Sequence, residues 1–132
     1  MKKIAALSLF FITVLTQAQE SPATYFRNYT GTVTISKKEA MEMDTFKVHL
    51  KDSKIDMNKF VVVSYDFTVV VDSKATNTNV KTLASKGNSL STEAKELLKQ
   101  VVAGSKVFVD NVSATDSKGK TVKASGITFK VQ

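Results

Sequence analysis

Residues 90–112, LSTEAKELLKQVVAGSKVFVDNV, decide the fold because one helix signal is followed at once by a strand signal. Aliphatic residues recur there at intervals of three and four, on a single stripe of a helix over about 91–103. They are Ala94, Leu97, Leu98, Val101 and Val102. Ser91 is the expected N-cap, and Gly104 is the expected stop after the last turn. An apolar stripe needs an apolar surface to cover, so the helix is predicted to pack on the core.

The strongest strand signal is KFVVVSYDFTVVVD at residues 59–72. Its odd positions from Val61 to Val71 are apolar or aromatic throughout, which predicts one face buried along its whole length. The run would span roughly 40 Å, long for a small domain, so a bend or a crossing between two sheets is expected. Alternation also predicts strands in NYTGTVTIS (28–36) and TFKVHLK (45–51).

The last two strands each contain a change of parity. Apolar residues move from odd to even positions within KVFVDNVSA (106–114), and from even to odd within TVKASGITFKV (121–131). One extra residue in a strand resets the alternation in this way. We therefore predict β-bulges near 110–111 and 125–126, with both strands bending at a similar level.

The remaining segments are polar connections. KKEAMEMD (37–44) predicts a loop or a short turn of helix, and 73–89 predicts a turn-rich stretch with one short strand near Val80. DSKG (116–119) predicts a hairpin turn with Gly119 in the left-handed position. Together these elements predict a mostly β chain, a β-sandwich of immunoglobulin-like outline with one amphipathic helix.

The first residues are typical of an export signal. Two lysines precede an apolar run at 4–15, and the small side chains at 16 and 18 are those that signal peptidase accepts. We expect a cleavable signal peptide at 1–18, a polar lead-in at 19–30 and one domain at 31–132. Because the run is shorter than the about 20 residues of a spanning helix, no membrane span is expected after cleavage. The protein is predicted to be periplasmic or extracellular.

Composition narrows the possible functions. Cysteine is absent, so an exported chain depends on its apolar core rather than on disulfides, and thiolate metal sites are excluded. After removal of the signal peptide, 17 basic and 12 acidic residues remain, a net charge of +5. The lysines are scattered, whereas nucleic-acid-binding proteins cluster basic residues with stacking aromatics. A nucleic-acid partner is therefore not expected.

Patterns that carry catalysis are missing from the sequence. The only histidine, His49, lies on the polar parity of a strand without a second histidine nearby. Asp66 lies in the middle of a strand, where a wet patch on the polar face is expected. Neither a nucleophile elbow nor a phosphate-binding glycine loop is present. No catalytic, cofactor-binding or metal-binding residue is assigned, and the protein is expected not to be an enzyme.

The ordered segments resemble a known family. GTVTISKKEA, FKVHLKDSKIDMNKFVVVSYDFTVVV, the opening stretch and DSKGKTVKASGITFKV are similar in order and character to the C-terminal domain of GldM. GldM is a periplasmic component of gliding motility and the type IX secretion system. The resemblance covers about residues 31–132 and rests on packing motifs, so it implies a fold more than an activity. GldM itself has a transmembrane helix and several domains in series, whereas a single domain behind a signal is expected here.

The resemblance implies an exported, non-enzymatic protein-interaction module of the bacterial envelope, accessory to gliding motility or type IX secretion. Its partners would be envelope or secretion-system proteins, bound at exposed strand edges or at loops. An alternative is a small-ligand or glycan-binding β-sandwich protein, with Tyr25, Phe26 and Tyr29 as an exposed aromatic platform. An enzyme using His49, Asp66 and a serine is the third possibility.

Overall fold

The computed structural model describes residues 22–50, 60–71 and 79–132, so the expected signal peptide at 1–18 lies outside it. The described elements are β1 (Ala23–Tyr25), β2 (Gly31–Ile35), α2 (Lys37–Met41), β3 (Lys47–His49), β4 (Val61–Val71), β5 (Asn79–Lys86), α3 (Thr92–Leu98), β6 (Lys106–Thr115), β7 (Thr121–Ala124) and β8 (Ile127–Val131). Neither helix has the length and apolar character needed to cross a membrane.

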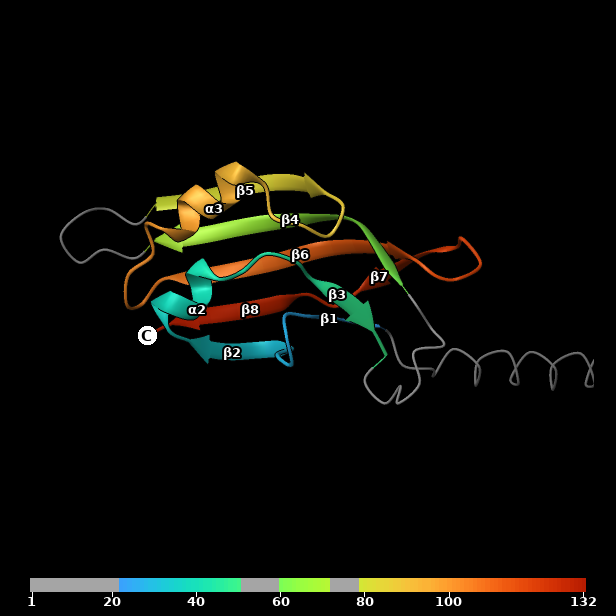
Figure 1. The fold of residues 1–132 in the computed structure, drawn as a ribbon, viewed down its shortest axis with the longest axis horizontal. Coiled ribbons are helices and arrows are strands. Elements are labelled where there is room, and N and C mark those ends of the chain that lie inside the picture. The colour runs from blue at the N-terminus through green and yellow to red at the C-terminus, as the bar shows by residue number, and fades with distance from the viewer. Residues whose placement is uncertain (1–21, 51–59, 72–78) are drawn as a thin grey trace, which may run out of the picture.

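Six strands form one large sheet. Five of them follow the order β2-β8-β6-β4-β5, and the sixth, β7, pairs with the second half of β6, whose first half pairs with β8. The strand pairs are antiparallel except for β2 and β8, which run parallel. A second, two-stranded sheet joins β1 to β3. Figure 1 shows α2, α3 and β3 lying over one face of the large sheet. The mostly β fold class predicted from the sequence is confirmed, and the second layer of the sandwich is small.

The core lies between these two layers. Alternate residues of β4, β6 and β8 supply its largest part, since Phe67, Val107, Val109 and Phe129 are fully buried. The covering layer supplies Phe46 and others from the opposite side. The remaining face of the large sheet is half-buried or exposed along the same strands. Only one face of the large sheet is therefore built into the core.

One of the two bulges predicted for the last strands is present, near 110–111, whereas at 125–126 the structure has a break between β7 and β8 without a register shift against β6. The pairing of β4 with β6 shifts register between Ser64 and Asp66, and Asn111 of β6 has a left-handed φ of +50°. On the neighbouring strand, β7 ends at Ala124 and β8 begins at Ile127. The two interruptions lie side by side, because 112 pairs with 124 and 109 pairs with 127. The alternation resets in both strands at the same level, as the sequence indicated.

A further register shift makes one expectation wrong. The odd positions of β4 were expected to be buried throughout, but Val61 and Val63 are 64% and 45% exposed while Val62 is buried. The shift lies between Val62 and Ser64, where β4 carries one residue more than β6. The first part of β4 therefore presents its even residues to the core. This is the bend that the length of the strand predicted.

The helix predicted over 91–103 is shorter in the structure. Ser91 is the N-cap as expected, and its hydroxyl accepts a hydrogen bond from the Ala94 N–H at 3.1 Å. The helix ends at Leu98, after which Val101 is still buried in the core. Val102 was expected on the buried stripe, but it is 41% exposed because the chain leaves the helical path before it.

Gly104 was expected to stop this helix, and that assignment is wrong. Its φ is +96°, as a glycine allows, but Lys99 is the C-cap five residues earlier. The Gly104 N–H donates to the Val131 carbonyl at 2.8 Å, and the Ser105 hydroxyl accepts from the Val102 N–H at 3.0 Å. Gly104 therefore turns the chain from the end of the helix into β6 beside β8.

Two segments expected to be polar connections contain strands. β5 is an eight-residue strand, longer than the short strand expected near Val80. Within the expected lead-in at 19–30, Ala23–Tyr25 form β1 and are buried. The Thr24 N–H donates to the Ser125 carbonyl, and the Ser125 N–H donates to the Pro22 carbonyl, both at 3.0 Å. This part of the lead-in belongs to the folded domain, where it fills the gap between β7 and β8.

Gly126 tests this account of the paired interruptions. A Cβ at this residue would collide with the Val109 carbonyl oxygen. Gly126→Ala should therefore lower the free energy of unfolding by about 1–3 kcal/mol, as overpacking does. Urea unfolding measures the change. Gly119→Ala is the control, because nothing lies within 4 Å of its Cβ position and only the strain of a φ of +82° is expected. An equal effect at both glycines would contradict the steric explanation.

Candidate protein-interaction site

β5 ends the large sheet on one side and pairs only with β4 within the described residues (Figure 1). The Gly87 N–H donates to the Val63 carbonyl at 2.7 Å, in the same register as the rest of the β4–β5 pair. Since hydrogen-bonded residues alternate in an antiparallel pair, the odd residues of β5 bond to β4. The N–H and C=O groups of Val80, Thr82, Ala84 and Lys86 therefore point outward, away from the sheet.

The side chains along this edge leave its backbone open. β5 contains neither proline nor a bulge, and its only charged residues are Lys81 and Lys86. Natural edge strands are usually blocked by such features, because an open row of N–H and C=O groups pairs with other chains. Lys81 lies 3.8 Å from Glu93 of α3, in an exposed ion pair on the core side. The run at 82–85 carries no charged side chain.

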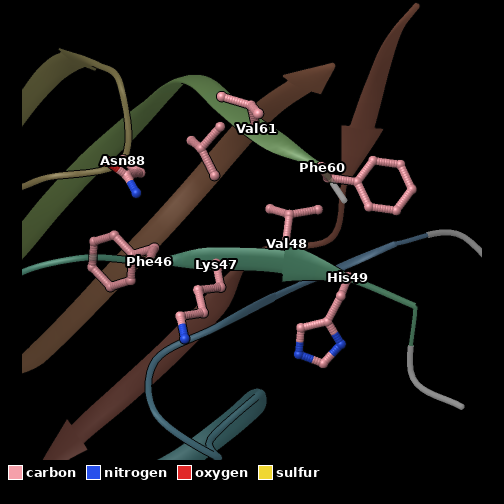
Figure 2. A pocket seen from close by; sticks show the side chains of 8 residues that line it. Phe46, Lys47, Val48, His49, Phe60, Val61 and Asn88 are labelled. Atoms are coloured by element: carbon pink, nitrogen blue, oxygen red, sulfur yellow. The ribbon is translucent and has the colours of Figure 1, made fainter. Parts of the chain in front are cut away.

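A groove of about 270 Å³ lies between β3 and the start of β4 (Figure 2). Its lining is mainly apolar and includes Phe46, Val48, Phe60 and Val62. In Figure 2, Val48 points toward β4, whereas Lys47 and His49 extend from the other side of β3. No hydrogen-bonded pairing between β3 and β4 occurs in the described chain, so the groove is a gap between the two sheets. It can accept a small apolar group.

The structure does not bring His49 and Asp66 together. The His49 ring stacks on Tyr25 with ring centroids 3.8 Å apart, in the layer that covers the core. Asp66 lies between the buried Tyr65 and Phe67, so it is on the opposite face of the large sheet. There it accepts a hydrogen bond from the Asn111 amide at 3.4 Å. Among residues 22–50, 60–71 and 79–132, no three His, Asp or Glu side chains are close enough to share a metal ion.

The aromatic platform suggested for ligand binding is wrong for two of its three residues. Tyr25 and Phe26 are 9% and 4% exposed. Phe26 packs edge-on against Phe46 and Phe129, with centroids 6.3 and 5.8 Å apart. These ring contacts join the N-terminal segment to the core, and β1 also pairs with β3 in the two-stranded sheet. Of these three aromatic residues, only Tyr29 is partly exposed.

Tyr29 makes a contact that the sequence did not reveal. Its hydroxyl donates to the Glu39 carboxylate at 2.7 Å, and the two residues are ten positions apart with β2 between them. Glu39 also completes a capping box with Ser36 at the start of α2. The hydrogen bond from Tyr29, together with those from Ser36, lowers the pKa of Glu39. The S-x-x-E spacing at 36–39 is a known capping signal, but nothing in the sequence indicates the tyrosine.

A family model described as the GldM C-terminal domain matches residues 20–132. The chain belongs to the GldM C-terminal domain family. The match includes β1 as well as the domain expected from residue 31, in agreement with the buried position of β1 in this GldM C-terminal domain. No curated protein matches the chain.

The Tyr29–Glu39 contact gives the GldM C-terminal domain a pH-dependent contribution. A carboxyl whose pKa is lowered by folding stabilises the protein above its ordinary pKa, and this stabilisation is lost as pH falls through the lowered value. Tyr29→Phe should therefore reduce the stability at neutral pH and leave it closer to that of the unmodified protein in acid. Urea unfolding at neutral and acidic pH measures this. Glu39→Gln should remove the same pH-dependent part of the stability. If Tyr29→Phe lowered the free energy of unfolding by the same amount at every pH, the assignment to the Tyr29–Glu39 contact would be wrong.

Proposed function

We propose that this protein is an exported, non-enzymatic protein-interaction module of the bacterial envelope that binds an extended partner segment at the edge of β5. The observation that carries the proposal is the outward row of backbone groups at alternate residues from Val80 to Lys86. An extended peptide would add to this row as a new strand, with main-chain hydrogen bonds providing much of the affinity.

Family membership supports the cellular setting. GldM acts on the periplasmic side of the envelope in gliding motility and type IX secretion, so proteins of that machinery are the partners we propose. The signal peptide expected at 1–18 supports export. The role is accessory: the described domain contributes a binding edge, and no energy-coupling role is transferred from GldM to it.

A proline at Ala84 tests the edge directly. Ala84 is exposed, and its N–H points outward, so Ala84→Pro removes a hydrogen-bond donor from the free edge without removing a β4–β5 bond. Ala84→Ser is the matched control, because it changes the side chain and keeps the N–H. Both variants should fold, as circular dichroism and thermal unfolding would show.

The binding measurement uses envelope extract from a bacterium that has a type IX secretion system. The unmodified protein and Ala84→Ser should capture the same type IX components, whereas Ala84→Pro should capture at least about tenfold less of them, since each lost interaction of 1.4 kcal/mol changes affinity tenfold. Equal capture by both variants would exclude the β5 edge. Capture of no envelope protein by the unmodified form would exclude the proposed function itself.

A second candidate function is the binding of a small ligand or glycan. The groove of about 270 Å³ between β3 and β4 favours it, because its apolar lining could take one ring or a short aliphatic group. Ligand binding in the groove should not depend on residue 84, whereas binding of a strand at the β5 edge should. A soluble glycan bound equally by the Pro and Ser variants of Ala84 would support the groove.

A further inference from the structure

A hollow of about 280 Å³ lies where β5 begins beside the end of α3; we call it the α3 hollow. Figure 1 shows α3 lying over β4 and β5. Two strands and the end of the helix line the hollow, through Val69, Val71, Asn79, Val80, Lys81, Leu97 and Gln100. The space is therefore bounded by the sheet on one side and by α3 on the other.

The α3 hollow is on the face of the sheet that carries the core. Val69 is buried and pairs in register with Lys81, and Val71 pairs with Asn79. Residues paired in register project their side chains from the same face of a sheet, so Lys81 and Asn79 also point to the core side. The ion pair between Lys81 and Glu93 of α3, at 3.8 Å, agrees with this direction.

The apolar part of the lining is incompletely covered. Leu97 belongs to the apolar stripe of α3, yet it is only half-buried, whereas Ala94 and Leu98 of the same stripe are fully buried. Val71 is half-buried too, and both it and Leu97 pack against the core. An apolar side chain placed in the hollow would remove the exposed parts of Val71 and Leu97 from water, which is favourable.

The α3 hollow adjoins the free edge of β5. Val80 begins the outward row of backbone groups and also lines the hollow. A strand added to β5 would lie about 4.8 Å from it, so its core-side residues would be neighbours of Asn79 and Lys81. Long and aromatic side chains reach both the directly opposite and the diagonal residues of an adjacent strand. One core-side residue of an added strand would therefore lie at the rim of the hollow.

We infer that the α3 hollow receives an apolar side chain, of the size of leucine or phenylalanine, from the partner segment that adds to the β5 edge. The inference rests on the proposed function, in which main-chain hydrogen bonds hold the segment. Those bonds are alike for most sequences, and specificity in strand addition comes from pockets that accept alternate side chains. The volume is just below that of pockets for whole drug-sized ligands, so it suits one side chain.

Synthetic peptides test the preference for an apolar residue. The probes are fluorescein-labelled peptides of seven threonines, which favour extended structure, and one central guest: leucine, phenylalanine, alanine or aspartate. Fluorescence polarisation over a concentration series of the purified protein measures each dissociation constant. The leucine and phenylalanine peptides should bind about tenfold more tightly than the alanine and aspartate peptides, or better, because only they bury a large apolar side chain.

Variants of Gln100 test where this side chain binds. Gln100 is exposed and lies outside β5, so its replacement should leave the fold and the free edge intact. Gln100→Trp places an indole in the hollow and should bring the four peptides to similar affinities. Gln100→Ala, the matched control, leaves the hollow open and should keep the preference. Methyl NMR gives a second readout, since the leucine peptide should shift the signals of Val71 and Leu97 and the alanine peptide should not.

The same peptides separate this inference from the proposed function. Ala84→Pro should weaken all four peptides alike, because it removes a donor from the edge. Equal affinities of the four guests, with binding still weakened by Ala84→Pro, would overturn the inference and leave the β5 edge in place. A preference that Gln100→Trp retains, without shifts at Val71 and Leu97, would also overturn it, as would binding of none of the peptides. Peptide affinities that Ala84→Pro leaves unchanged would exclude the edge and, with it, both proposals.

Discussion

The backbone of Gly126 lies so close to the Val109 carbonyl that the sheet has no room for a side chain there. This contact occurs where β6 bulges at Asn111 and where the chain passes from β7 to β8. Because both strands change parity at the same level, apolar residues of all four flanking segments reach the core. β1 uses the same place, since Ser125 exchanges backbone hydrogen bonds with Pro22 and Thr24. The one-sided core of the large sheet depends on this junction.

A sheet with one buried face needs a cover, and the rest of the chain provides it. The two-stranded sheet and the two short helices together hide the core face, with Phe46 and Leu98 fully buried at the contact. The cover is small, so the opposite face and the β5 edge are left without a described neighbour. The β5 edge offers backbone hydrogen bonds in the plane of the sheet.

The sequence contained the parts of the fold that depend on alternation within one segment. The parity changes at 106–114 and 121–131 predicted the paired interruptions, and the stripe containing Ala94 and Leu98 predicted the packed helix. The exposure of Val61 and Val63 was not predictable in this way, because the register shift is a property of the β4–β6 pair. β5 is exposed on most of its length and so shows no clear alternation. A three-residue strand such as β1 is too short for any periodic signal.

For the candidate site, the sequence predicted that a strand edge would bind a partner, but it did not predict which edge. A resemblance to the GldM C-terminal domain suggested strand edges, and the family match over residues 20–132 agrees with that resemblance. Which edge is open depends on the strand order, and the outward direction of residue 84 depends on the register at Gly87. These properties arise from pairing between distant segments, so no local motif announces them.

The central claim is that β5 presents a free row of backbone groups in the folded protein. Amide hydrogen exchange, measured residue by residue by NMR on the purified protein, tests it most directly. The account predicts slow exchange at Lys81, Leu83 and Ser85, which bond to β4, and fast exchange at Thr82 and Ala84, which point outward. Protection of Thr82 and Ala84 equal to that of their neighbours would show that the edge is covered and would contradict the account.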